Sequence, residues 1–302
     1  MSICSPLNPM IFSKALTLMQ TSLISSGVAL SIVLGYSARS IAQVSLSPMT
    51  IQVSAKRGQA SGFITVSNPT DQAFRAKVYA EAFTYEAEKG FKTLTAEAAG
   101  QSNLIPYLQF SPQDLIVPPK STRRVRLITR LPANAPKGEY RAVIFTESLQ
   151  EKQEVLDNKQ GMLNLRTRIG STFYVYNGEI SPAKVKIDSI QWHEGKQAFQ
   201  VKLKNEGEVT ERAFINWQLK KNNTIVHSGE VLPAGIIPQG ERKVLLTPQI
   251  TEGRMTSPLS PGRYQLVGTL SWGEAIREQP SENFTLEVEV PGASATATPA
   301  AK

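Results

Sequence analysis

The sequence has very few residues suited to thiol or metal chemistry. It contains one cysteine and two histidines in 302 residues. Cys4 precedes an apolar run at the N-terminus and has no second cysteine with which to form a disulfide. His193 and His227 do not stand at metal-ligand spacing from each other or from a group of carboxylates. We therefore expect no disulfide, no metal and no cofactor, and a fold stabilised by core packing.

The sequence signatures of common enzyme classes are missing as well. There is no G-x-S-x-G elbow, no P-loop and no dinucleotide fingerprint. Acids such as Asp114, Glu139 and Glu147 are scattered along the chain and do not form a pattern for general acid–base catalysis. The sequence therefore predicts a protein that is not an enzyme.

A long apolar run occurs only near the N-terminus. Lys14 is the sole charge before the run at 15–34, and Ser40-Ile41-Ala42 places small residues at its two outer positions, as signal peptidase requires. We interpret residues 1–42 as a secretory signal peptide. An uncleaved anchor is the alternative, although the run contains many Ser and Thr residues for a membrane span. Loss of this segment, which carries Lys14 and Arg39 and no acid, would reduce the net charge from +8 to +6.

The rest of the chain shows short runs with period-two alternation, separated by turn residues. The segments 63–67, 74–85, 122–131 and 199–203 are examples, and at most one helical turn is expected, within 86–100. This pattern predicts an all-β fold with two immunoglobulin-like β-sandwiches in tandem. We place the domains at 43–177 and 178–290, expect seven strands in the second, and expect a disordered tail at 291–302.

The segment 162–176, MLNLRTRIGSTFYVY, has the longest alternation. It predicts one long strand with an apolar face and a polar face, and the charged segment before it, 150–161, is expected to be a mobile loop. Such a strand is either the last core strand of the first sandwich or a strand offered to another protein. The apolar face would hold Leu163, Leu165, Thr167, Ile169, Ser171, Phe173 and Val175.

A basic strand is expected at 122–131. Val125, Leu127 and Thr129 should point one way, and Arg124, Arg126, Ile128 and Arg130 the other. The arginines could form a solvated strand face that deters edge pairing, or they could contact an anionic group of a partner. Aromatic residues are not interleaved with them, which disfavours nucleic-acid binding.

Residues 43–177 resemble the first domain of the PapD-like periplasmic pilus (fimbrial) assembly chaperones, and 184–290 match as a second immunoglobulin-like domain. The resemblance implies a periplasmic chaperone that lends its last first-domain strand to secreted, strand-deficient subunits, and it implies an outer-membrane usher as a second partner. The resemblance rests on five groups of residues. These are Ser47-Pro48, FITVSNP at 63–69, FSPQDLIVPP at 110–119 followed by Arg124-Val125-Arg126-Leu127, Leu131-Pro132 ahead of Glu139-Tyr140-Arg141-Ala142, and Arg168-Ile169 with Phe173-Tyr174-Val175.

The resemblance also implies site residues. Leu163, Leu165 and Ile169 stand where the family's donor residues stand, and would fill the client's groove. The family holds the client's terminal carboxylate with an Arg in the first strand and a Lys in the last. Neither is found here, so Arg166, Arg168 and Arg126 are the substitutes that we expect. Neither a nucleic acid nor a small-molecule substrate is implied. The alternative function is a structural or adhesive tandem-sandwich protein that binds partners through loops or its arginine-rich strand.

Overall fold

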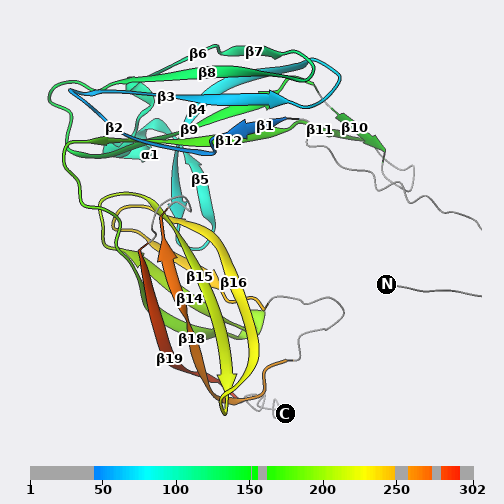
Figure 1. Ribbon diagram of the computed structural model, residues 1–302, viewed down its shortest axis with the longest axis vertical. Helices are drawn as coiled ribbons and strands as arrows, with labels where there is room; N and C mark the ends of the chain where they lie inside the picture. Colours follow the sequence, from blue (N-terminus) through cyan, green and yellow to red (C-terminus); the bar gives the residue numbers. More distant parts are fainter. Residues whose placement is uncertain (1–43, 151, 156–161, 249–257, 274–279, 293–302) are drawn as a thin grey trace, which may run out of the picture. The chain divides into compact units, whose positions relative to one another are not determined.

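The computed structural model describes residues 44–150, 152–155, 162–248, 258–273 and 280–292 (Figure 1). All of them belong to the compact unit Ile41–Lys302. The predicted signal peptide, residues 151 and 156–161 of the expected loop and most of the expected tail lie outside the described residues. Strands dominate the described chain, so the prediction of an all-β protein with two sandwiches is confirmed.

The first sandwich consists of two facing sheets. One sheet has the order β1-β3-β8-β6, and the other has the order β2-β12-β9-β4-β5, with β7 also paired to β4. The strands of the first sheet are β1 (Ser45–Ser47), β3 (Gln59–Asn68), β8 (Ser121–Arg130) and β6 (Leu108–Ser111). Those of the second are β2 (Thr50–Ser54), β12 (Arg168–Asn177), β9 (Gly138–Ser148), β4 (Phe74–Glu86), β5 (Gly90–Leu94) and β7 (Asp114–Val117).

The core of this sandwich follows from period-two alternation. On β8, Val125 and Leu127 are fully buried while Arg124 and Arg126 are exposed, as predicted. Side chains from the opposite sheet, among them Ile144 and Phe173, meet them from the other side. Each such side chain stabilises the fold by roughly 1.5–3 kcal/mol when it is fully buried.

The outer face of the six-stranded sheet is also apolar near its centre. Phe83, Val143, Phe145 and Tyr174 form a second cluster there, and the ring centroids of Phe83 and Tyr174 are 5.8 Å apart. The prediction that β12 has one polar face is therefore wrong for the half of the strand that contains Tyr174. Aromatic rings from β4, β9 and β12 cover one another and exclude water from a face that alternation alone would leave exposed.

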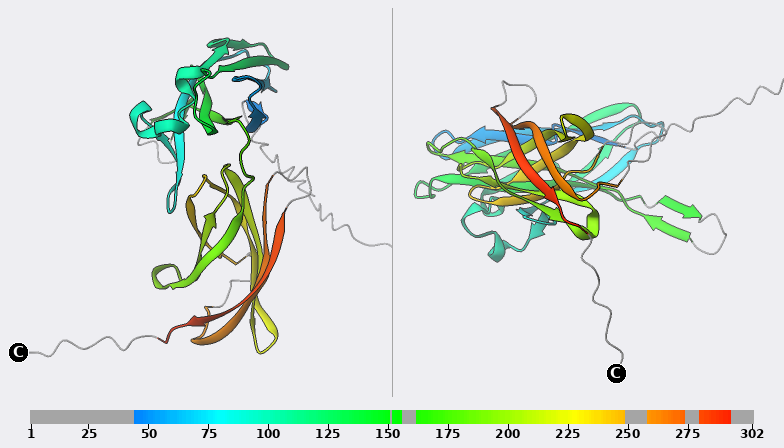
Figure 2. Two further views of the ribbon diagram at one scale, coloured as in Figure 1. Left: turned by 90° about the vertical axis from the view of Figure 1, so that its left-hand side faces the viewer. Right: turned by 90° about the horizontal axis from the view of Figure 1, so that it is seen from below.

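The prediction of one long strand over 162–176 is also wrong. The segment divides into β11 (Met162–Leu165) and β12, and β11 pairs with β10 (Lys152–Val155) in a separate two-stranded sheet. The ladder between β9 and β12 ends near Ser148, whose hydroxyl is bonded to both the carbonyl and the N–H of Gln150. Figures 1 and 2 show the β10–β11 hairpin projecting from the first sandwich, where we had expected a loop at 152–155.

The second sandwich has seven strands in the described chain, as predicted. Its sheets have the orders β13-β14-β17 and β16-β15-β18-β19. Buried side chains such as Val201, Leu203 and Trp217 fill the space between them. The strands are β13 (Val185–His193), β14 (Ala198–Asn205), β15 (Glu211–Lys221), β16 (Thr224–Ile236), β17 (Glu241–Leu245), β18 (Gly262–Trp272) and β19 (Ser281–Val290).

Helical structure is limited to single turns among the described residues. The helix α1 (Ala96–Ala99) is the turn expected within 86–100, and Thr95 caps it by accepting a hydrogen bond from the Ala98 N–H. The 3-10 turns are η1 (Gly100–Ser102), η2 (Ile105–Tyr107) and η3 (Glu194–Lys196). In the described part of the chain no helix is long and apolar enough to span a membrane.

Each sandwich contains a buried asparagine at the end of a strand. Asn68 ends β3 and Asn205 ends β14, and each Oδ1 accepts a hydrogen bond from the N–H two residues later, at 3.0 Å in both cases. Each Nδ2 also donates to three backbone carbonyls, which fixes the turn to a neighbouring strand. These carbonyls are Gln72, Val117 and Pro118 for Asn68, and Val209, Ile236 and Ile237 for Asn205.

Candidate functional site

The edge of β12 is only half covered. On one side, β9 pairs with β12 over its whole length. On the other side, β2 pairs in parallel with Thr172–Tyr176 alone. The Thr172 N–H donates to the Met49 carbonyl at 2.9 Å, and strand alternation directs the Gly170 N–H to the same side, beyond the end of β2. In the described chain, no strand pairs with residues 168–171 on that side.

The edge opens because the chain changes sheets between β1 and β2. The strand β1 pairs with β3 in the four-stranded sheet, and β2 pairs with β12 in the other. Pro48 lies at the crossing, where its carbonyl accepts a hydrogen bond from the Ser171 hydroxyl at 2.8 Å. The residues that precede Met49 therefore belong to the opposite sheet and do not pair with residues 168–170.

The three predicted donor residues do not share one strand. Leu163 and Leu165 lie on β11, opposite Glu154 and Lys152 of β10. Ile169 lies on β12, where it is partly buried against the core of the first sandwich. The break at residues 166–167 separates the two segments, so a partner strand would have to follow both the hairpin and the open edge.

The three predicted anion-binding arginines are divided between the two sheets of the first sandwich. Arg126 lies on β8 in the four-stranded sheet, whereas Arg166 and Arg168 precede or begin β12 in the other. Arg166 Nη1 lies 3.5 Å from Glu147, and Arg168 Nη1 lies 3.7 Å from Glu81. An anionic client group would have to compete with these carboxylates, and Arg126 cannot join the other two in one site.

Arg168 is further held by two aromatic residues. Its guanidinium lies 4.1 Å from the ring centroid of Phe145, and Nη1 donates to the Tyr79 hydroxyl at 3.2 Å. The same hydroxyl donates to Glu147 Oε2 at 2.7 Å. The hydrogen bond from Tyr79 lowers the pKa of Glu147, and the hydrogen bond to Tyr79 raises the pKa of Arg168. The network keeps both groups charged beside the open edge.

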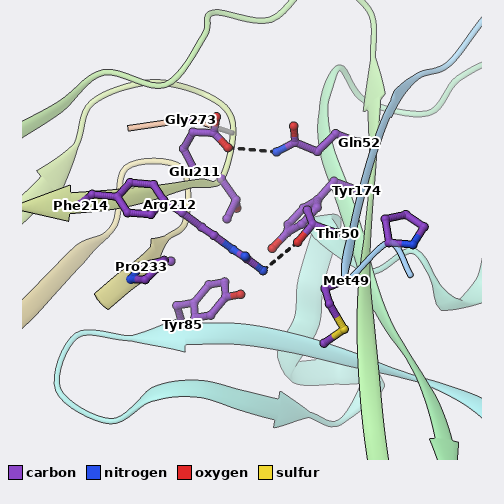
Figure 3. Close-up of a pocket in the computed structure, with 13 residues that line it drawn as sticks. Met49, Thr50, Gln52, Tyr85, Tyr174, Glu211, Arg212, Phe214, Pro233 and Gly273 are labelled. Carbon is purple, nitrogen blue, oxygen red and sulfur yellow. Dashed lines mark hydrogen bonds between the residues drawn. The ribbon is translucent and has the colours of Figure 1, made fainter. Parts of the chain in front are cut away.

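A cavity of about 450 Å³ lies next to the covered half of the β12 edge. Figure 3 shows side chains from β2, β12 and β15 converging on it. Its wall is largely apolar, and the apolar residues that line it include Pro48, Met49, Tyr85, Tyr174, Phe214 and Pro233. Burial raises the pKa of Tyr174 well above its usual value, so its hydroxyl stays neutral. The cavity is suited to an apolar group from a partner.

Arg212 is the cation of this cavity. Its side chain extends across the opening in Figure 3, and Nη2 donates to Thr50 Oγ1 at 2.8 Å. No carboxylate of the described residues lies within ion-pair distance of Arg212, whereas the neighbouring Glu211 accepts a hydrogen bond from Gln52 at 3.0 Å. Arg212 therefore offers charged donors to an incoming anion at little cost, because it would exchange only a neutral partner.

Sequence reasoning missed Arg212. The residue comes from the second sandwich, 162 positions away from Thr50. Its sequence context, an ordinary start to a strand, gives no sign of the first sandwich. Only the long-range pairing of the folded chain brings Arg212 to β2, and no local pattern encodes that contact.

Among the described residues, no group of three or more His, Cys, Asp or Glu side chains is placed to hold a metal ion. The region around β12 instead offers an open strand edge, an apolar cavity and the guanidinium of Arg212.

Comparison with known proteins returned solved structures only. No family model and no curated protein sequence matches the chain. One match is a chain of the CsuC-CsuE chaperone-tip adhesion subunit pre-assembly complex from archaic chaperone-usher Csu pili of Acinetobacter baumannii. It is 13% identical with a TM-score of 0.47, and the match covers 80% of this chain and 98% of that chain. The YadV chaperone is 9% identical with a TM-score of 0.46, covering 81% and 100% respectively.

A third similar structure is that of the Salmonella enterica SafA pilin in complex with the SafB chaperone. It is 11% identical with a TM-score of 0.44, and the match covers 81% of this chain and 96% of that chain. At such identities the similarity concerns chain architecture. The function is therefore argued below from the residues of this chain.

Proposed function

We propose that this protein is a periplasmic, non-enzymatic chaperone that binds strand-deficient secreted subunits of the pilus type and passes them to an outer-membrane usher. The observation that carries the proposal is the half-open edge of β12, which β9 covers on one side and β2 leaves uncovered before Thr172. An exposed strand edge is a template for a further strand. Here the β10–β11 hairpin lengthens that template.

Client binding would combine backbone and side-chain terms. The outward N–H and C=O groups of residues 168–171 would pair with a client strand and provide affinity. Leu163, Leu165 and Ile169 would set the register, because a slip by one residue would reverse the face that each side chain occupies. Each side chain that the client buries completely would contribute roughly 1.5–3 kcal/mol.

Arg212 would receive the client's terminal carboxylate. It has available donors beside the apolar cavity, whereas Arg166 and Arg168 already face Glu147 and Glu81. This assignment replaces the three arginines that we expected from the sequence. A carboxylate on a guanidinium accepts two parallel hydrogen bonds, which would fix the end of the client strand.

The proposal is tested by hydrogen exchange on the protein alone and with a purified strand-deficient fimbrial subunit. Without the subunit, the Gly170 amide should exchange much faster than that of Phe173, whose N–H points toward β9. With the subunit, the Gly170 amide should become protected. Unchanged exchange at Gly170 in a complex of the two proteins would show that the client binds elsewhere.

A matched pair of variants tests the side chains. Leu163→Glu should weaken the complex by at least about tenfold, because a carboxylate would have to enter an apolar groove. Asn164→Glu, one position along the same strand, should leave the affinity nearly unchanged. Equal effects of the two variants would refute the register proposed here, and unfolding of Leu163→Glu would place Leu163 in the protein's own core.

A further inference from the structure

The four-stranded sheet of the first sandwich contains no acidic residue. None of β1, β3, β8 and β6 includes an Asp or a Glu. Its outward face carries Arg124, Arg126 and Arg130 in a row on β8, together with Phe63 and Ile128. We call these five residues the arginine face. The remaining outward positions hold only neutral residues, namely Ser45, Ser47, Gln59, Ser61, Thr65, Ser67, Gln109, Ser111 and Thr122.

The arginine face lacks the ion pairs that are common elsewhere in the described chain. Arg124 stacks on Phe63 with its guanidinium carbon 4.6 Å from the ring centroid, and no carboxylate of the described residues lies within 4.0 Å of Arg124, Arg126 or Arg130. By contrast, Lys202 lies 3.2 Å from Asp188 and 2.9 Å from a second carboxylate. Unpaired like charges on one strand repel each other, so the row is not explained by stability.

Protection of a sheet edge explains only part of the row. β3 pairs with the whole of β8, whereas β6 covers the other edge at Arg126–Thr129 alone. The interpretation of these arginines as guards against edge pairing therefore fits Arg124 and does not fit Arg126. Phe63, which is 48% exposed, also places a large apolar ring among the charges. An exposed apolar ring does not improve the solvation of a charged surface.

We propose that the arginine face is a docking surface for an anionic phospholipid bilayer. Alternate residues on a strand are about 6.6 Å apart, so the row from Arg124 to Arg130 spans roughly 20 Å on a broad sheet face. Guanidinium groups bind phosphate oxygens with two hydrogen bonds, and an exposed aromatic ring beside them can enter the headgroup region. The arginine face could therefore bind several lipid phosphates at once, because a bilayer surface can adjust the positions of its headgroups.

The size of the face favours a lipid surface over a folded protein. The row is about 20 Å long and the four strands are about 15 Å across, which gives roughly 300 Å². A stable protein interface needs about 800 Å² on each partner. An anionic bilayer requires no such area, because each arginine near its surface contributes independently. This inference does not depend on strand lending, since the arginine face and the β12 edge lie in different sheets.

The test is sedimentation of the protein, recovered from the secreted compartment, with vesicles of phosphatidylglycerol and phosphatidylcholine at low salt. Neutral phosphatidylcholine vesicles serve as the reference. The triple variant Arg124→Gln, Arg126→Gln, Arg130→Gln should lose about a hundredfold in partitioning, or about fivefold for each arginine. The control triple Lys184→Gln, Lys196→Gln, Arg263→Gln removes the same charge from exposed positions on the second sandwich and should retain binding.

Several outcomes would overturn the proposal. Equal losses in the two triple variants would mean that net charge alone drives adsorption. Absence of wild-type binding to the anionic vesicles would exclude a lipid partner. Arginine-dependent binding to polyglutamate, but not to vesicles, would identify an acidic protein as the partner instead. Circular dichroism of both variants checks the fold, and Phe63→Ala should weaken the binding that persists at high salt.

Discussion

Glu139 of the first sandwich accepts two hydrogen bonds from Thr210 of the second. The Thr210 N–H donates to Oε2, and the Thr210 hydroxyl donates to Oε1 at 2.6 Å. Arg141 Nη1 donates to the same carboxylate at 3.1 Å. Both partners are buried, with 7% of Glu139 and 2% of Thr210 exposed. A charged acceptor removed from water is therefore surrounded by donors.

Stability should depend on pH through Glu139. Burial raises its pKa above the ordinary value of 4.5, although Thr210 and Arg141 oppose the shift. A folded-state pKa above the unfolded one means that the associated stability is present at low pH and is lost as pH rises through the folded pKa. As the pH rises from 4.5 to the folded-state pKa, the free energy of unfolding should fall more for the wild type than for Glu139→Gln. Parallel urea-unfolding curves across this window would contradict the assignment.

Glu147 should behave in the opposite way. The hydrogen bond from Tyr79 is the main reason that its pKa lies below 4.5. Its contribution to stability is therefore present above pH 4.5 and is lost as the pH falls through the folded pKa. We expect Tyr79→Phe to raise the pKa of Glu147 in an NMR titration of its carboxyl carbon. An unchanged titration would show that Arg166 and Arg168 alone hold the group.

Gly170 should be intolerant of a side chain. A Cβ atom at this position would lie 2.8 Å from Val143 Cγ2 and 2.9 Å from Phe145 Cε1. Gly170→Ala should therefore destabilise the protein by about 1–3 kcal/mol, measured by urea unfolding. At Gly195 the nearest atom is 3.6 Å away, so Gly195→Ala should change stability by less than about 0.5 kcal/mol. Similar values for the two variants would mean that the Phe145 ring moves aside freely.

Arg212→Gln should weaken client binding without unfolding the protein. The side chain is exposed, and its bond to Thr50 is a single contact with a neutral hydroxyl. Loss of a charge-assisted pair with a carboxylate should cost about 1.5–3 kcal/mol, or roughly tenfold to a hundredfold in Kd. The control ligand is a subunit whose C-terminal carboxylate has been converted to an amide. Wild type and variant should bind the amidated subunit equally, and a difference there would exclude a carboxylate contact.

Asn68→Ala and Asn205→Ala should each destabilise their own sandwich by at least about 2 kcal/mol, because buried carbonyls would lose their donor. Asn216, which is exposed on β15, provides the control, and Asn216→Ala should be nearly neutral. Calorimetry of the double variant Asn68→Ala, Asn205→Ala should show additive losses, since the two sites share no partner. A small effect at either position would mean that its turn is held by other contacts.

Alternation predicted the architecture well because it reports burial directly. On β8 the side chains of Val125 and Arg126 lie where the sequence placed them. The errors arose where distant segments decide the outcome. The burial of Tyr174 depends on Phe83 of another strand, and the break after Leu165 depends on pairing with β10. Arg212 reaches Thr50 across 162 positions, which no local pattern reveals.

Asn68 and Asn205 have a practical consequence for comparing the two sandwiches of this chain. In each case Nδ2 donates to the carbonyl four residues later and to two consecutive carbonyls of a distant segment. A superposition of the two halves can use that geometry although the neighbouring residues differ. The two side chains give one fixed landmark in each half of the molecule, from which equivalent positions can be counted outward.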